Sequence, residues 1–151
     1  KKIDPNNYIE PDELVNLIET FWKEKDRFID DYVQKNPLYL TYRNLNIIKD
    51  FKYGMRKNFL LAVYEKNYTV LNDDGINYMV KGLNENLDKF IPAEKTPMLI
   101  QTAIMPFNGM IIYDGFISTA DMQLSQKLVS KAFEDYSYGQ KIYSLLPKNM
   151  N

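Results

Sequence analysis

The sequence of 151 residues contains no cysteine and no histidine. These absences exclude disulfides, thiolate nucleophiles and zinc sites of the usual kind. Without histidine there is no Ser–His triad and no side chain whose ordinary pKa lies near neutrality. No glycine-rich run precedes a helix in the way that phosphate loops require. We therefore predict no metal site and no cofactor.

An excess of charge of one sign is also lacking, since 19 basic and 20 acidic residues leave a net charge of −1. Proteins that bind nucleic acid usually carry a basic excess that displaces counterions, so we predict no nucleic-acid partner. No apolar run reaches the roughly 18–20 residues that span a bilayer, so no membrane partner is predicted either. The length and the apolar content of 45% suit one globular domain over residues 1–151.

The densest apolar stretch covers residues 98–118 and reads MLIQTAIMPFNGMIIYDGFIS. Two apolar runs rich in β-branched and aromatic residues flank the dipeptide Asn108-Gly109. This combination is the strongest short-range signal for a β-hairpin. We expect this hairpin to be the centre of the fold.

Helical periodicity dominates the first third of the chain. Residues 1–10 predict an irregular lead-in, and residues 12–35 repeat apolar positions at helical spacing until Asn36-Pro37 ends the pattern. Thr41 is a plausible N-cap for a second helix over 42–53. We expect both helices to cover the core.

Strand patterns follow. Residues 58–72 are rich in valine, leucine, tyrosine and threonine, with a bulge or a turn at 65–67. After a turn at 73–75, residues 76–81 alternate between two faces, as a half-buried antiparallel strand does. These patterns favour strands that pair with the central hairpin.

The remaining segments predict a crossover and a helical end. In residues 82–97 Asn84 could cap one short helix, residues 122–137 predict a last helix, and 141–146 could dock as a strand or turn. Together the elements predict an α+β fold. An antiparallel sheet of about four or five strands would pack against two N-terminal helices and one C-terminal helix.

Asp114 is the one charge in the second run of the hairpin. A buried, unpaired carboxylate is costly, and Asp-Gly is a common turn pair, so a structural role is the first interpretation. The alternative is a functional carboxylate, with Glu65, Asp73 or Asp74 as a second acid near strand ends. Asp73-Asp74-Gly75 lacks the continuation of a calcium loop and predicts a turn.

Two aromatic residues are further candidates for ligand contact. Tyr113 precedes Asp114, and Trp22 is the one tryptophan of the chain. Both side chains combine a large apolar ring with a polar group, which suits partly exposed binding surfaces. We therefore name Asp114, Tyr113 and Trp22 as candidate binding residues and assign no catalytic residue.

The stretch from Met105 to Gly115, MPFNGMIIYDG, resembles a motif of a family of uncharacterised bacterial proteins. The family's members resemble one another in a Leu/Met-Pro-Phe-x-Gly-x-Ile-Ile-Tyr-Asp-Gly hairpin, a tryptophan-bearing N-terminal helix and an Asn-Pro break. The resemblance covers residues 20–146, and the zinc-binding Cys/His tail of some members is absent here. It implies a bacterial, cytoplasmic setting and a shared fold, and it transfers no catalytic residue.

The functional hypothesis rests on these exclusions. Abundant aromatic residues without a recognisable nucleophile, metal cluster or phosphate loop favour a non-enzymatic binding or protein-interaction module, with a protein or small ligand as partner. One alternative is an enzyme that uses carboxylates, with Asp114 near a cleft. Another is a small-ligand domain with a pocket near the central hairpin.

Overall fold

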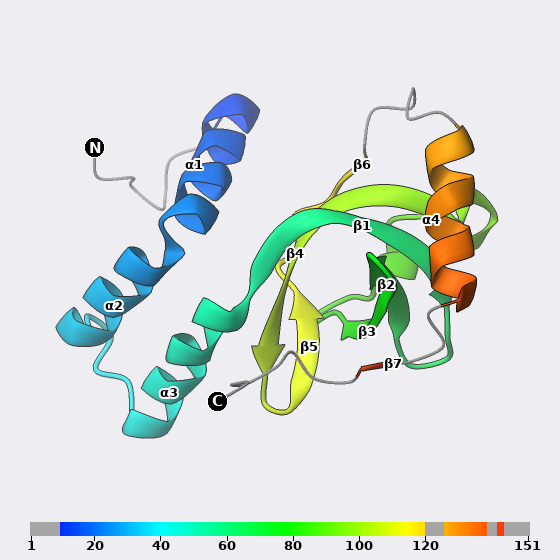
Figure 1. The fold of residues 1–151 in the computed structure, drawn as a ribbon. Helices are drawn as coiled ribbons and strands as arrows, with labels where there is room; N and C mark the ends of the chain where they lie inside the picture. Colours follow the sequence, from blue (N-terminus) through cyan, green and yellow to red (C-terminus); the bar gives the residue numbers. More distant parts are fainter. Residues whose placement is uncertain (1–9, 120–125, 139–141, 144–151) are drawn as a thin grey trace. The chain divides into compact units, whose positions relative to one another are not determined.

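The computed structural model describes residues 10–119, 126–138 and 142–143 (Figure 1). Backbone contacts divide the chain into two compact units, Lys1–Lys49 and Asp50–Asn151. The α+β class is confirmed. The expectation of a single domain over residues 1–151 stays a prediction.

The first unit corrects the prediction of one continuous helix over 12–35. Two helices occupy this range, α1 (Pro11–Lys23) and α2 (Lys25–Lys35), and Glu24 separates them with φ −118° and ψ 23°. In a straight helix, residues seven apart are separated by about 10.5 Å along the axis. Across the break the rings of Phe21 and Phe28 stack with centroids 6.1 Å apart. The stacked aromatic pair is thus a packing contact that the break makes possible.

The link from α2 to the next helix follows the sequence prediction. α2 ends at Lys35 and is capped by Asn36, whose φ of +39° lies in the left-handed region. The helix α3 (Tyr42–Asp50) begins after Thr41, and the Thr41 hydroxyl accepts a hydrogen bond from the Asn44 amide at 3.3 Å. The predicted N-cap is therefore confirmed. The helix predicted over 42–53 finishes in a 3₁₀ turn, η1 (Phe51–Tyr53).

The second unit is built on a mixed sheet with more strands than the four or five expected. Its strands are β1 (Met55–Tyr64), β2 (Thr69–Asp73), β3 (Ile76–Lys81), β4 (Met98–Phe107), β5 (Met110–Tyr113), β6 (Ser118–Thr119) and β7 (Ile142–Tyr143). The expectation of a purely antiparallel sheet is corrected, because β3 runs parallel to both β5 and β7. All the other pairings are antiparallel.

The strand order closes on itself. The path runs β1-β2-β3-β5-β4, and β4 pairs again with residues 55–61 of β1. The long β1 can serve both neighbours because its register shifts between Leu61 and Val63, where a bulge bends the strand. Closure removes the open edges of these five strands.

The hairpins follow the predicted turn chemistry. β4 and β5 are joined by Asn108 at φ +49° and Gly109 at φ +77°, and Phe107 faces Met110 across the turn. Positive φ at both turn residues matches the type I′ turn that Asn-Gly favours. The stretch predicted as strand over 58–72 is divided into β1 and β2. Of the bulge and the turn predicted as alternatives at 65–67, the structure contains the turn.

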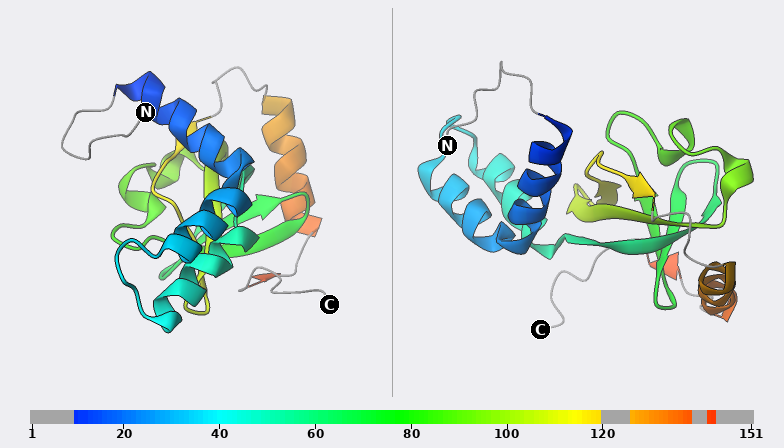
Figure 2. Two further views of the ribbon diagram at one scale, coloured as in Figure 1. Left: turned by 90° about the vertical axis from the view of Figure 1, so that its left-hand side faces the viewer. Right: turned by 90° about the horizontal axis from the view of Figure 1, so that it is seen from above.

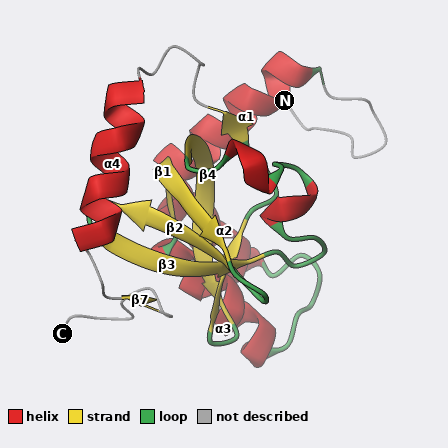
Figure 3. Ribbon diagram, turned by 90° about the vertical axis from the view of Figure 1, so that its right-hand side faces the viewer, coloured by secondary structure: helices red, strands yellow, loops and turns green. Residues whose placement is uncertain are grey.

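The core has two layers, one inside the ring of strands and one outside it. The inner layer contains Phe59, Leu61, Leu71, Val80, Ile100, Ile104 and Ile111. On the outer face, Leu60, Ala62 and Val70 pack against Val129, Ala132 and Tyr136 of α4 (Gln126–Tyr138). Figures 2 and 3 show α4 along the outside of the strands. The helix predicted over 122–137 is thus present, although 122–125 lie outside the described residues.

The crossover between β3 and β4 differs from the single short helix that was expected. It contains two 3₁₀ turns, η2 (Leu87–Lys89) and η3 (Ala93–Lys95). Asn86 rather than Asn84 precedes the first turn, and its side-chain oxygen accepts a hydrogen bond from the Gly82 amide at 2.9 Å. Pro92 follows too soon for a full α-helix to continue. The part of 141–146 that the structure describes is β7, a strand as one of the alternatives predicted.

Candidate functional site

The crossover loop 82–97 is held against the barrel by two tyrosine hydroxyls. The hydroxyl of Tyr64 on β1 donates to the carbonyl oxygen of Ile91 at 2.8 Å. The hydroxyl of Tyr113 on β5 donates to the carbonyl oxygen of Glu85 at 2.6 Å. Leu87 of the same loop is fully buried in the inner core. These anchors fix the loop as one wall of a cleft.

The cleft lies between this loop, η1 and the strands β4 and β5, all within the second unit. Its volume of about 590 Å³ falls in the range of small-ligand pockets, roughly 300–1,000 Å³. The walls are mostly apolar and come from Phe51, Leu83, Phe90, Met105 and Ile112. Leu83 and Phe90 are largely exposed to solvent, although they are large apolar side chains. Such a surface suits a ligand that buries apolar area.

Among the residues that line the cleft, the charged ones are Glu85 and Asp114, and both are acidic. Burial raises the pKa of the Tyr113 hydroxyl, and the carboxylates of Glu85, Asp114 and Asp88 raise it further. A negative field opposes formation of a phenolate. The cleft therefore combines apolar walls with two acidic side chains.

Asp114 has the backbone role that the Asp-Gly pair predicts. Its carboxylate accepts a hydrogen bond from the Phe116 amide at 3.0 Å, and its own amide donates to the Ala103 carbonyl at 3.0 Å. Gly115 between them takes a φ of +88°. This is an aspartate turn that closes on its own backbone two residues on. The turn holds a partly exposed carboxylate at the edge of the cleft.

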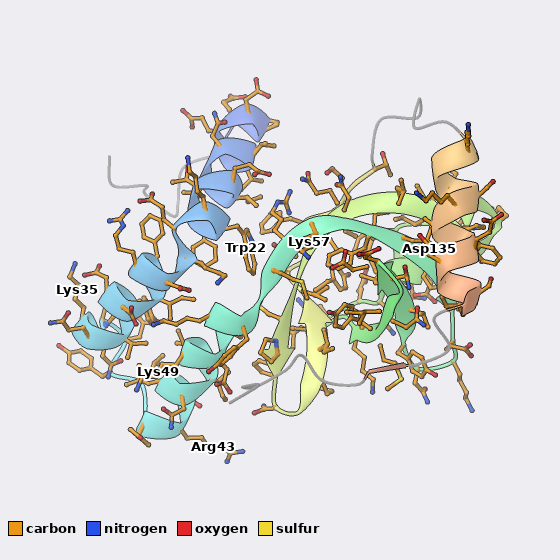
Figure 4. The ribbon with its side chains drawn as sticks, viewed as in Figure 1. Trp22, Lys35, Arg43, Lys49, Lys57 and Asp135 are labelled. Carbon is orange, nitrogen blue, oxygen red and sulfur yellow. The ribbon has the colours of Figure 1, made fainter. Side chains whose placement is uncertain are left out.

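The structure brings together two of the three predicted binding residues. Tyr113 and Asp114 are adjacent in the cleft wall. Trp22 belongs to the first unit, where its ring makes an edge-on contact with Phe21 at a centroid distance of 5.5 Å. Asp73 is in an ion pair with Lys57, which Figure 4 labels on β1, at 2.9 Å.

Sequence reasoning missed the residues that complete the cleft. Glu85 and Phe90 come from the crossover loop, and Phe51 comes from the turn before β1. None of the second carboxylates considered beside Asp114, namely Glu65, Asp73 and Asp74, lines the cleft. Two large apolar residues in a short loop rich in polar residues, Leu83 and Phe90, were the one available signal.

No family model matches the chain, and no curated protein or solved structure is significantly similar to it. The resemblance through the hairpin motif therefore stays a prediction. In the part of the chain that the structure describes, no group of three or more acidic residues is placed to hold a metal ion. Within those same residues, no helix is both long enough and apolar enough to cross a lipid bilayer.

We expect alkaline pH to weaken the fold through Tyr64. Burial raises the pKa of Tyr64 to about 12, with further contributions from Asp88 and Tyr113. A tyrosine in the unfolded chain loses its proton near pH 10, roughly two units lower. Between these two pH values the unfolded state binds fewer protons than the folded state, so the free energy of unfolding falls as pH rises. Below pH 10 both states keep the proton, and the stability is fully retained.

Urea unfolding of the wild type and Tyr64→Phe, from neutrality to about pH 12, measures this effect. The variant loses the hydrogen bond to Ile91, which costs about 1 kcal/mol at neutral pH. Its stability should then decline less steeply than that of the wild type at alkaline pH. Parallel declines would show that other groups, such as Tyr113, cause the whole loss.

Proposed function

We propose that this protein is a non-enzymatic binding module whose cleft takes up an apolar group bearing a positive charge. The observation that carries the proposal is the lining itself. Apolar walls surround two carboxylates, Glu85 and Asp114, and no basic side chain lies among the lining residues. Apolar contact would supply the affinity, and the carboxylates would select for a cation.

The barrel supports the proposal. A ring of five strands with a buried core gives a rigid base, and the two tyrosine hydrogen bonds hold the loop in place. Binding to a cleft that is already formed avoids the cost of ordering a loop. Five-stranded barrels serve as binding modules for several kinds of ligand, so the fold is compatible with this function without specifying the ligand.

A functional carboxylate at Asp114, the basis of the alternative enzyme, has weaker support. One of its oxygens accepts the Phe116 amide, which makes the carboxylate part of a turn. A general base would need that oxygen directed at a substrate proton. We therefore assign Asp114 to ligand selection through its charge.

The test uses two indole compounds of opposite charge, cationic tryptamine and anionic indole-3-acetate. We expect tryptamine to bind more tightly than indole-3-acetate by roughly tenfold or a larger factor. The two compounds share the indole ring and differ mainly in charge, so the carboxylates of the cleft should favour the cation. Protein NMR titration gives both dissociation constants and shows which amides shift. The shifts should include residues of the loop 82–97 and of β5.

The matched variant is Glu85→Gln with Asp114→Asn. The introduced asparagine can still accept the Phe116 amide, and the Glu85 side chain is exposed, so the fold should be retained. The preference for tryptamine should disappear, while binding of the ring itself remains. If the wild type bound both compounds equally, or if the shifts lay away from the cleft, the proposal would be wrong.

A further inference from the structure

A second surface of this protein has the opposite character to the cleft. The loop between α2 and α3, together with the first residue of α3, exposes three large side chains, Leu38 at 69%, Tyr39 at 93% and Tyr42 at 75%. Together with Lys35 and Arg43, they form what we call the basic loop surface. Side chains of this size are rarely left so exposed together without a partner.

Basic side chains predominate within this segment, although Asp31, just before it, offsets the charge of Lys35. Residues 32–49 contain three basic side chains and no acidic one. Figure 4 shows Lys35 on the last turn of α2 and Arg43 on the first turn of α3, both directed away from the ribbon. Lys35 is in an ion pair with Asp31 at 2.9 Å, and the ammonium of Lys49 lies 5.7 Å from the centre of the Tyr42 ring. For Arg43 no ion pair is present within the described part of the chain.

The loop is held in one shape. The side chain of Asn36 accepts the Leu40 amide at 2.7 Å and donates to the Leu40 carbonyl at 3.1 Å. Between the two hydrogen-bonded residues, Tyr39 takes a φ of +52°, which is unusual for a bulky residue. Its side chain is exposed to solvent. A loop that is already ordered loses little entropy when a partner covers it.

We propose that the basic loop surface of one copy of this protein occupies the acidic cleft of a second copy. This inference rests on the function proposed for the cleft and names its occupant. Leu38, Tyr39 and Tyr42 would meet the apolar walls, and Arg43 would approach Glu85 and Asp114 of the second copy. Both surfaces are on the same chain, so each copy carries both halves of the contact.

Such a contact is heterologous, because two different surfaces meet. Repetition of a heterologous contact produces rings when the geometry closes and open chains when it does not. The surface of a single loop is small, and interfaces below about 1,200 Å² are typical of weak and transient association. We therefore expect self-association that grows with concentration and decreases with salt, since the contact pairs opposite charges.

Two variants separate the halves of the contact. The loop variant is Tyr39→Asn with Arg43→Glu; asparagine accepts the left-handed backbone at position 39, so the loop shape is kept. The cleft variant is Phe90→Ala with Glu85→Lys, and both of its positions are exposed. For each variant alone, the association constant should be lower than that of the wild type by roughly tenfold or a larger factor.

The decisive measurement mixes the two variants in sedimentation equilibrium. The cleft variant keeps an intact loop surface and the loop variant keeps an intact cleft. An equimolar mixture should therefore form a one-to-one dimer that cannot grow further. Self-association of either variant at the wild-type level, or a mixture that stays monomeric, would overturn the proposal.

Tryptamine distinguishes this inference from the function on which it rests. If the wild type binds tryptamine in the cleft but stays monomeric up to millimolar concentration, the cleft has another occupant and only this inference fails. If neither tryptamine nor a second copy binds, both proposals fail. If both are correct, tryptamine should compete with self-association and dissociate the wild-type assembly.

Discussion

Replacement of Gly82 by alanine should destabilise the fold by about 3 kcal/mol or more and lower the melting temperature by roughly 10 °C. A methyl group at this position would lie 1.7 Å from the carbonyl oxygen and 2.4 Å from the carbonyl carbon of Glu85. It would also approach the amide nitrogen of Asn86 to 3.0 Å. All three atoms belong to the backbone, so no side chain can rotate away to relieve the overlap.

The overlap affects the cleft as well as stability. The Gly82 amide donates to the Asn86 side chain, and the Glu85 carbonyl accepts from the Tyr113 hydroxyl. Widening the turn to admit a methyl group would displace both hydrogen bonds. We therefore expect Gly82→Ala to lose tryptamine binding even at temperatures where it remains folded. Circular dichroism melts and NMR titration measure the two effects separately.

Gly109→Asn is the matched control. Gly109 has a φ of +77°, and a Cβ there would have no atom within 4 Å. Asparagine is among the residues that tolerate the left-handed region best, so the free energy of unfolding should fall by only about 1 kcal/mol, less than for Gly82→Ala. If Gly82→Ala melted as the control does, the turn at 82–86 would be able to open without cost.

The sequence predicted well those features that depend on neighbours along the chain. The Asn108-Gly109 hairpin, the Thr41 N-cap and the turn at Asp114 each follow from side chains that act on backbone groups a few residues away. The alternation over 76–81 also predicted a strand, β3, that the structure contains. Local patterns therefore predicted these turns, this cap and most of the strands, including the strand of the cleft wall that carries Tyr113.

Features that depend on distant residues were not predictable in this way. Closure of the barrel requires β1 to pair with both β2 and β4, and the parallel pairing of β3 with β5 has no local signature. The crossover loop is shaped by hydroxyls of Tyr64 and Tyr113, which are far from it in sequence. Because these contacts make the second wall, Glu85 and Phe90 could not be assigned to a site beforehand.

The break at Glu24 shows a different limit. The apolar periodicity of 12–35 continues through it, so the pattern alone predicts one helix. The break allows Phe21 to stack on Phe28, and the spacing of apolar residues along the sequence does not reveal this packing contact. A hydrophobic repeat specifies which face is apolar but does not show whether the helix axis stays straight.

Replacement of Leu87 by alanine should cost about 2–5 kcal/mol, because the side chain is only 1% exposed and packs in the inner core. Leu87 and Ile91 of the crossover loop both pack in the inner core, and two tyrosine hydrogen bonds hold the loop to the barrel. A cavity at Leu87 would therefore loosen the loop as well as the core. Urea unfolding measures the loss of stability, and amide hydrogen exchange in residues 82–97 measures the loosening.

Phe90→Ala is the comparison that separates folding from function on the same loop. Phe90 is 57% exposed and lines the cleft, so its loss should change stability by about 0.5 kcal/mol or less. Tryptamine binding should nevertheless weaken roughly tenfold, because a large apolar wall is removed. If Leu87 anchors the loop and Phe90 contacts the ligand, Leu87→Ala should lose stability, whereas Phe90→Ala should lose binding at nearly unchanged stability. Equal losses of stability would mean that both residues serve the core, and unchanged binding in Phe90→Ala would place the ligand elsewhere.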